Sequence, residues 1–380
     1  MEKDLAFLRI LTIFYYMANV KKGETKNQHY VPQFYQRNFS QDGKTIATYV
    51  LSKNKFIPRA PIKNQSSGDY FYSDNMTIEK TLGDIEGMAN GVIKKIINTP
   101  MEKLTGEEEE ILYIFTMLQV GRTNFQVELI RESATIFSRK ILKKLVDAKR
   151  KIGKEKEVKD ITDEIVDCIE VDFNSIGAMA LGTQAQLEKI CRDLRYKILI
   201  NHTDKTFITS DNPAVTYDIF MERMTQNYAL GSRGLMIYLP LSPKHGVLFY
   251  DAECYKIGDK KKKFVLLTLE KDIVELNKLI IAKATNVIYC NPTLYSEYQI
   301  GKLCRDNIIY RLKERVGSYI DMTLKDGSEI IGSYHIPVFC KLSLSFLKEL
   351  PKYSYLKPHQ YNPNIHKFRD IAFYRNALLH

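Results

Sequence analysis

Hydrophobic and polar positions change their period twice along the chain. Near the N-terminus, Thr45–Leu51 alternates with the two-residue period of a strand. Lys55–Ile62 carries two prolines and is predicted to be an edge strand or a loop. The aromatic run Asp69–Ser73 predicts a further strand packed near the first. Helical spacing then prevails until Arg195, where short apolar runs with strand character return.

The helical region is predicted to contain several helices with apolar positions three or four residues apart. They span Ile78–Asn98, Glu107–Val120, Thr123–Ile152, Asp163–Ala180 and Gln184–Arg195. Thr77 and Thr105 stand where N-caps are expected, and Glu79 lies in the first turn of the first helix. The third helix is predicted to bury a row of apolar side chains, namely Leu129, Ile130, Ile136, Phe137, Ile141, Leu142 and Leu145.

The last part of the chain is predicted to form a sheet with two helices. The expected strands are Tyr196–Asn201, Thr206–Thr209, Met236–Leu239, Gly246–Tyr250, Lys263–Leu269 and Val287–Cys290. The expected helices are Leu276–Thr285 and Ser296–Arg315, and Asp326-Gly327 indicates a hairpin. We therefore predict an α+β fold with a mixed sheet, a helical insertion and a C-terminal α/β extension. The predicted boundaries are an N-terminal segment at 1–26, a core domain at 27–292 and an extension at 293–380.

Composition places the chain among globular proteins, with 44% hydrophobic and 27% charged residues in 380. The formal net charge of +11 favours an anionic partner such as nucleic acid, although a lysine-rich solvated surface explains it equally well. Six cysteines lie far apart without a CxxC pair, which argues against a zinc ribbon or a disulfide framework. We expect reduced thiols in a cytoplasmic protein that is not bound to a membrane.

The first residues give no clear targeting signal. The apolar stretch 5–20 contains Arg9 and is too short to span a membrane. Because Met17 begins a natural soluble start, residues 1–16 are interpreted either as an upstream-start artefact or as a short amphipathic helix.

The richest candidate for chemistry is Asn27–Phe39, which reads NQHYVPQFYQRNF. It gathers His29, Arg37 and four Tyr or Phe rings around Pro32. Proline biases the residue before it toward an extended conformation, so we expect an extended entry followed by a turn or helix over Gln33–Asn38. The chain contains no Walker A loop, dinucleotide fingerprint, HExxH, GxSxG or kinase motif set.

A second candidate is the stretch TSDNP at Thr209–Pro213. It follows an apolar run and places Ser210, Asp211 and Asn212 at a predicted strand end, where polar side chains commonly face a cleft. The alternative is an Asx-type turn in which these side chains bond their own backbone.

These stretches together resemble a bacterial family. NQHYVPQFYQRNF, IEKTLGDIEG from residue 78, QVGR ending at Arg122, TSDNP, PLSP from Pro240 and LNKLIIAKATNVIYC ending at Cys290 resemble domain of unknown function 4238 over about 27–292. Gln36 departs from the family, which more often has an aliphatic residue there. The resemblance implies no particular activity, but its members look like accessory-genome proteins, which implies a role in phage defence or as a toxin.

Physical chemistry gives the shared positions candidate roles. His29 suits a general acid or base near neutral pH. Glu79 and Glu86 lie two helical turns apart and can project from one face. Arg122 and Arg37 suit the clamping of a phosphate or carboxylate. Asp211 would orient the histidine or, with Glu86, bind Mg²⁺ or Mn²⁺. The remaining predicted substrate contacts are Gln33, Ser210 and Asn212.

The opposing interpretation is structural. His29, Glu86 and Arg122 would then form a buried salt-bridged network, since structural ion pairs also cluster charges.

A weaker signal lies at the C-terminus. The sequence RNALLH places Arg375 five positions before His380 and resembles the RxxxxH motif of HEPN-type ribonucleases. On a helix the two side chains would lie close together.

Two functional hypotheses follow from the sequence. The first is a nuclease or other phosphate-ester-processing enzyme that acts on RNA or DNA. The second is a non-catalytic module that binds nucleic acid or another ligand and in which the same polar cluster is structural.

Overall fold

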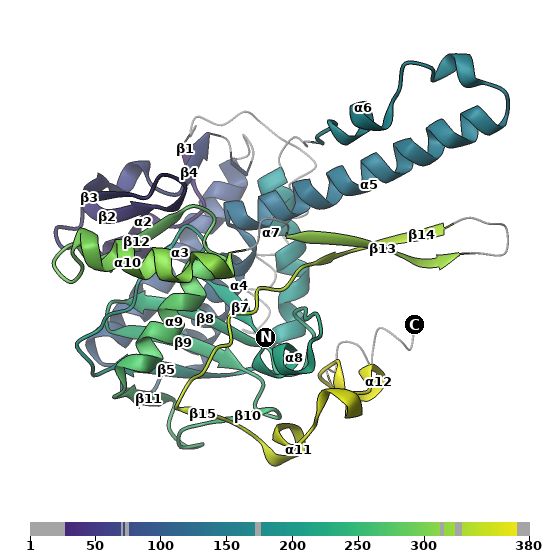
Figure 1. Cartoon of the computed structure of the whole chain (residues 1–380). Helices are drawn as coiled ribbons and strands as arrows, with labels where there is room; N and C mark the ends of the chain where they lie inside the picture. The colour runs from purple at the N-terminus through teal and green to yellow at the C-terminus, as the bar shows by residue number, and fades with distance from the viewer. Residues whose placement is uncertain are drawn as a thin grey trace.

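The computed structural model describes residues 27–69, 71–72, 76–171, 176–311, 315–323 and 329–370 (Figure 1). Its described residues form a five-stranded sheet with the order β11-β5-β9-β8-β7. These strands are β5 (Arg195–Asn201), β7 (Val215–Tyr217), β8 (Met236–Ser242), β9 (His245–Tyr250) and β11 (Phe264–Leu267). Since β11 runs parallel to β5 and the other pairs are antiparallel, the predicted α+β fold with a mixed sheet is confirmed.

A second, four-stranded sheet joins distant parts of the chain in the order β3-β2-β12-β6. Its strands are β2 (Thr45–Val50), β3 (Lys55–Pro61), β6 (Thr209–Ser210) and β12 (Val287–Cys290). As its prolines predicted, β3 is an edge strand. The next strand is β4 (Ser67–Asp69), which includes Asp69 of the aromatic run, whereas Phe71 and Tyr72 are not in a strand. This strand pairs antiparallel with β1 (Asn27–His29).

The described residues up to Asn307 also form helices. They are α2 (Gln33–Arg37), α3 (Met76–Asn98), α4 (Gly106–Gly121), α5 (Asn124–Lys151), α6 (Asp163–Asp167), α7 (Ile176–Leu187), α8 (Ile219–Met224), α9 (Glu270–Lys283) and α10 (Glu297–Asn307). Thr105 caps α4 as predicted, because its hydroxyl accepts from the Glu108 N–H and the Glu108 carboxylate accepts from the Thr105 N–H. In contrast, α3 already begins at Met76, so Thr77 lies within its first turn.

Three helices end at other residues than the sequence predicted. The stretch Asp163–Ala180 is not one helix but α6 and α7, since helical structure stops at Asp167 and resumes at Ile176. The next predicted helix is only the end of α7 followed by a 3₁₀ turn at Glu188–Cys191. Likewise, α10 stops at Asn307 and is followed by a 3₁₀ turn.

The long helix α5 extends away from the body of the molecule, and α6 lies beside it (Figure 1). Of the side chains predicted to be buried in its first half, Leu129 is buried, whereas Ile130, Ile136 and Phe137 are only half-buried. In its second half, however, Ile141 is 51% exposed and Leu145 is 56% exposed, so the predicted buried face is wrong there. The helical period alone does not reveal whether another element covers the face. Charged residues in this region pair locally, as Lys143 does with Asp167 at 2.9 Å.

The predicted hairpin is present as β13 (Val316–Thr323) and β14 (Glu329–His335), which pair antiparallel. It projects from the body on the same side as α5 (Figure 1). Downstream, β15 (Leu347–Glu349) pairs with β10 (Tyr255–Ile257). The helices α11 (Pro351–Ser354) and α12 (Pro363–His366) follow. This C-terminal tail, residues 338–370, packs on the sheet domain through the buried side chains of Leu342, Leu344 and Tyr353.

Both faces of the five-stranded sheet are buried. Along β8, Ile237 and Leu239 face one apolar cluster that includes α3 and α4. The alternate residues Met236 and Tyr238 face a second cluster that includes α9 and the tail. Among the described residues, none of the helices is long and apolar enough to cross a lipid bilayer.

Candidate active site

The opening motif folds around Pro32. This residue is the N-cap of α2 with extended backbone angles of −60° and 142°, which turns the chain from β1 into the helix. The Tyr35 hydroxyl is buried and donates to the Pro240 carbonyl at 2.5 Å, which fastens the motif to β8. Gln36, the departure from the family, is also buried and donates from Nε2 to the Val31 carbonyl at 3.2 Å. The aromatic side of the motif is therefore core, and the His29 side faces a pocket.

His29 lies at the end of β1 and is held through one ring nitrogen. Its Nε2 is 3.2 Å from the Lys63 carbonyl oxygen, which can only accept a hydrogen bond. The proton must therefore lie on Nε2, which leaves the Nδ1 lone pair unprotonated. Burial lowers the pKa of His29 below its usual value, against the opposing effect of the Lys63 hydrogen bond. His29 is thus neutral at pH 7 and has one nitrogen able to accept a proton.

Arg122, directly after α4, lies near His29, and its guanidinium group makes three polar contacts. Its side chain is only 2% exposed. Nη1 pairs with Glu86 Oε1 at 2.8 Å, Nε donates to the Tyr72 hydroxyl at 2.9 Å and Nη2 donates to the His29 carbonyl at 2.8 Å. Although burial lowers the pKa of Arg122, Tyr72 and Glu86 outweigh burial, and the net shift is upward. Arg122 positions the backbone of His29 and has few donors left for a ligand.

Two carboxylates from α3 lie beside this network. Glu79 and Glu86 are two helical turns apart, and both line the pocket, as their spacing predicted. Burial raises the pKa of Glu79; Arg122 opposes this shift and the charge of Glu86 adds to it. Glu86 forms an ion pair with Arg122. Glu79 has no such pair among the described residues, and its burial favours the protonated form of its carboxyl group.

The pocket itself has a volume of about 360 Å³ and opens to solvent. It is lined by His29, Gln33, Phe34, Arg37, Glu79, Leu82, Gly83, Glu86 and Arg122. Arg37 is exposed, and its Nη2 donates to Gln33 Oε1 at 3.1 Å within α2. Among the described residues no carboxylate pairs with its guanidinium, so Arg37 suits an anionic ligand better than Arg122 does.

The TSDNP residues do not join this pocket. The carboxylate of Asp211 accepts the backbone N–H groups of Thr285 at 2.8 Å, Asn286 at 2.8 Å and Val287 at 3.0 Å. It thereby fixes the turn between α9 and β12, and the structure does not bring it to His29. Burial raises the pKa of Asp211 to about 6, against the effect of these three donors.

The neighbours of Asp211 are equally occupied. The Ser210 hydroxyl donates to the Asn212 carbonyl at 2.8 Å, and the Asn212 amide donates to the Lys283 carbonyl at 2.9 Å. The Thr123 hydroxyl donates to the Asn212 side-chain oxygen at 3.0 Å. The predicted substrate contacts Ser210 and Asn212 thus lie outside the pocket and join the start of α5 to the end of α9.

We expect Asp211→Asn to lower the free energy of unfolding by about 1–2 kcal/mol, because an amide NH₂ would face a backbone N–H where an acceptor is now. Urea unfolding at pH 7 measures this loss. Asp306→Asn is the control, because its ion pair with Lys302 is exposed, and we expect it to change stability by less than about 0.5 kcal/mol. An equal effect of the two substitutions would contradict the role of Asp211 in the turn.

The donor set does not fit a Mg²⁺ or Mn²⁺ site at Glu86 and Asp211. Glu86 is paired with Arg122, and both oxygens of Asp211 accept backbone N–H groups. Within the described ranges, no group of three or more His, Cys, Asp and Glu side chains is placed to hold a metal ion. The C-terminal candidates Arg375 and His380 lie outside the described residues.

Sequence reasoning overlooked two contributors to the pocket. Tyr72 binds Arg122, and the Lys63 carbonyl orients His29. The aromatic run around Tyr72 signalled a buried neighbour of the motif, but no side-chain pattern could reveal a backbone carbonyl.

Fold and pocket together define an α+β protein with a mixed sheet, whose N-terminal motif packs its aromatic side on the core and presents a histidine, an arginine and two glutamates to solvent. The chain belongs to the family described as Protein of unknown function (DUF4238), which it matches over residues 27–293. This match agrees with the resemblance inferred from the motifs. No curated protein and no solved structure matches the chain.

Proposed function

We propose that the His29 pocket cleaves phosphate esters, with RNA as its substrate class. The observation that carries this proposal is the neutral His29, whose Nε2–H is held by the Lys63 carbonyl and whose Nδ1 is free to take a proton. Arg37 on the pocket rim supplies a guanidinium for a phosphate, and the net charge of +11 favours a polyanion. Glu79 supplies a carboxylic acid whose pKa is raised by burial.

These groups suit an acid–base cleavage that uses the substrate's own 2′-hydroxyl. His29 Nδ1 would take the 2′-hydroxyl proton while the 2′-oxygen bonds to phosphorus. The bond from phosphorus to the 5′-oxygen would break, and Glu79 would protonate that leaving oxygen. The products would be a 2′,3′-cyclic phosphate and a 5′-hydroxyl. DNA lacks the 2′-hydroxyl and would not react by this route.

The test is incubation of the purified chain with labelled RNA and DNA oligonucleotides, in EDTA and with added Mg²⁺ or Mn²⁺. We expect RNA cleavage that persists in EDTA and falls by about 10²–10⁴-fold in His29→Ala. His359→Ala is the matched control, because His359 is exposed and lies outside the pocket. Cleavage that survives in His29→Ala would overturn the site. A chain truncated after Tyr374 tests the RNALLH motif and is expected to stay active.

The pH profile is a separate prediction. His29 must be neutral to act as a base, so activity should rise through its lowered pKa, below the usual 6.5. Glu79 must be protonated to act as an acid, so activity should fall through its raised pKa, above the usual 4.5. We therefore expect a bell-shaped dependence of kcat/KM, with His29 setting the acidic limb and Glu79 the basic limb. The basic limb should disappear in Glu79→Gln, and an unchanged basic limb would exclude Glu79 as the acid.

A second candidate function is a module that binds nucleic acid without cleaving it. It is favoured by the contacts of Arg122 with Glu86, Tyr72 and the His29 carbonyl, which are the arrangement expected of a structural network. In that case RNA or DNA would bind without turnover, and Arg37→Ala would weaken binding whereas Arg59→Ala, another exposed arginine, would not. In either case we place the protein in the cytoplasm, in keeping with its six free cysteines, and propose a role in phage defence or as a toxin.

A further inference from the structure

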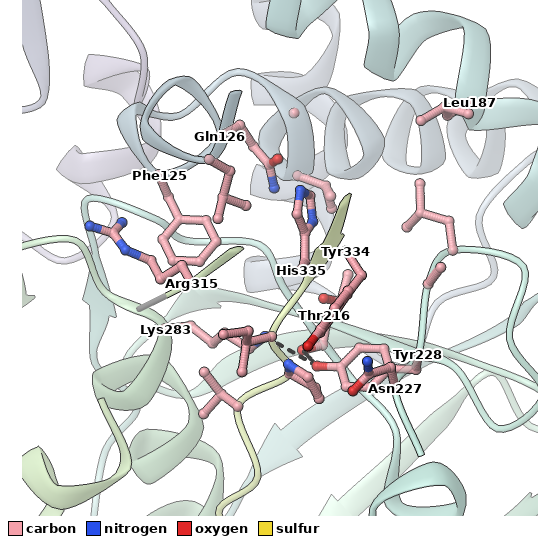
Figure 2. A pocket seen from close by; sticks show the side chains of 18 of the residues that line it. Phe125, Gln126, Leu187, Thr216, Asn227, Tyr228, Lys283, Arg315, Tyr334 and His335 are labelled. Atoms are coloured by element: carbon pink, nitrogen blue, oxygen red, sulfur yellow. Dashed lines mark hydrogen bonds between the residues drawn. The ribbon is translucent and has the colours of Figure 1, made fainter. Parts of the chain in front are cut away.

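A second and larger cavity of about 630 Å³ lies where α5, α7, the end of α9 and the base of the hairpin meet (Figure 2). Aliphatic side chains make up much of its wall, among them Leu129, Ile130, Leu187, Ile190, Leu235 and Val338. The volume falls within the range of pockets that hold small molecules. Val120 and Gly121 line it immediately before Arg122, so it lies on the other side of the α4–α5 junction from the His29 pocket.

Lys283 extends into this cavity from the last turn of α9. The residue is only 8% exposed, and its Nζ donates to the Tyr228 hydroxyl at 3.1 Å (Figure 2). That hydroxyl donates in turn to the Thr216 carbonyl at 3.0 Å. Within the part of the chain that the structure describes, no carboxylate pairs with Nζ. Burial lowers the pKa of Lys283 to about 8, and Cys340 opposes this shift, so the ammonium remains charged at pH 7.

The other charges that line the cavity are also positive. They are Arg311, Arg315 and Lys367, whereas none of the described lining residues is Asp or Glu. Arg311 donates to the carbonyls of Ala284 and Thr285, and Arg315 pairs with Glu132 at 3.4 Å. Burial and the charge of Lys283 both lower the pKa of His335, so this ring is neutral at pH 7. The wall thus presents an excess of positive charge to an apolar space.

We propose that this cavity binds a small amphipathic anion, an aliphatic chain of medium length that ends in a carboxylate or phosphate. The anionic head would pair with Lys283 beside the Tyr228 hydroxyl, and the chain would lie against the aliphatic wall. A buried ammonium without a carboxylate partner is costly, and an anionic ligand is the group that compensates it. The proposal does not depend on chemistry in the His29 pocket.

The test is calorimetric titration of the full chain at pH 7 with decanoate, decyl phosphate and decanol, each below its micelle-forming concentration. We expect at least one of the two anions to bind and decanol, which has the same chain without a charge, to bind at least tenfold more weakly. Decanoate and decyl phosphate distinguish the two heads. Inorganic phosphate alone should not bind, because it lacks the chain. Equal binding of decanol and the anions, or binding of neither anion, would overturn the proposal.

Variants of Lys283 test whether this residue binds the anionic head group. Lys283→Met should weaken binding of the anion at least tenfold, whereas Lys271→Met, an exposed lysine on the same helix, should leave it unchanged. In the wild type, affinity should fall about tenfold from pH 7 to pH 9 as Lys283 loses its proton. Lys283→Arg should bind without this pH dependence, because a guanidinium keeps its charge. Unchanged affinity in Lys283→Met would exclude Lys283 as the anchor.

Discussion

Replacing Arg122 with methionine is expected to lower the free energy of unfolding by about 3 kcal/mol at pH 7. Methionine fills much of the same space but removes every donor of the guanidinium. The Glu86 carboxylate would lose its partner at 2.8 Å, and the Tyr72 hydroxyl and the His29 carbonyl would lose theirs. Glu86 keeps some contact with water, so the expected loss lies at the lower end of the range for broken buried ion pairs. Urea unfolding of both proteins measures the difference.

A matched control separates burial from charge. Arg131 pairs with Glu128 at 2.6 Å on α5, but both side chains are about 30% exposed, at 31% and 30%. Arg131→Met should therefore cost less than about 1 kcal/mol. In Glu86→Gln/Arg122→Met, the combined loss should be smaller than the sum of the two single losses, because each single substitution already breaks the pair. Equal losses in Arg122→Met and Arg131→Met would show that the buried network contributes little to stability.

Local chemistry explains which parts of the fold were predictable. The cap at Thr105 and the turn of the chain at Pro32 each depend on residues within four positions of one another. Both were predicted from the sequence, and both are present in the structure. Asp326-Gly327 likewise predicted the pairing of β13 with β14. The exposed end of α5 was not predictable, because its apolar spacing is helical whether or not another element covers it.

The candidate site was predictable where spacing constrained it. The seven-residue interval between Glu79 and Glu86 put both on one face of α3, and both line the His29 pocket. Asp211 shows the limit of this reasoning. Its carboxylate is bound by backbone N–H groups 74 to 76 positions further along the chain, and nothing in TSDNP indicates such distant donors. Without a fold, a polar residue at a strand end is equally compatible with a site and with a turn.

The burial of Lys283 has a signal in the sequence, although its surroundings do not. The residue follows Leu279–Ala282, so it is a lysine at the end of an apolar helical run, where burial is expected. What the run could not show is that the hairpin base and the Tyr228 loop close a cavity over the ammonium. That closure brings together segments far apart in the sequence, as the separation of 55 positions between Lys283 and Tyr228 illustrates.

We expect Lys283→Met to raise the free energy of unfolding at pH 7 by about 3.5 kcal/mol. The pKa of Lys283 falls from the usual 10.5 to about 8 in the folded chain, and each tenfold loss of proton affinity corresponds to about 1.4 kcal/mol. Below pH 8 the folded protein carries the whole cost of a buried charge. Between pH 8 and pH 10.5 the unfolded chain binds more protons than the folded one, so wild-type stability rises with pH. The advantage of the variant should therefore disappear by about pH 10.5.

The control lies on the same helix. Lys278 is also 8% exposed, but its Nζ pairs with Glu275 at 2.8 Å. Lys278→Met should lower stability, because it leaves Glu275 without its partner, whereas the same substitution at Lys283 should raise it. Urea unfolding of both variants at pH 7 and pH 10 tests the contrast, and a loss of stability in Lys283→Met at pH 7 would contradict it.

A charge that reduces stability by this amount fits a residue kept for binding, since sites that serve function commonly reduce stability. Bound decanoate or decyl phosphate should then reduce the difference in free energy of unfolding between the wild type and Lys283→Met. Either anion binds only the folded protein and binds the wild type more tightly.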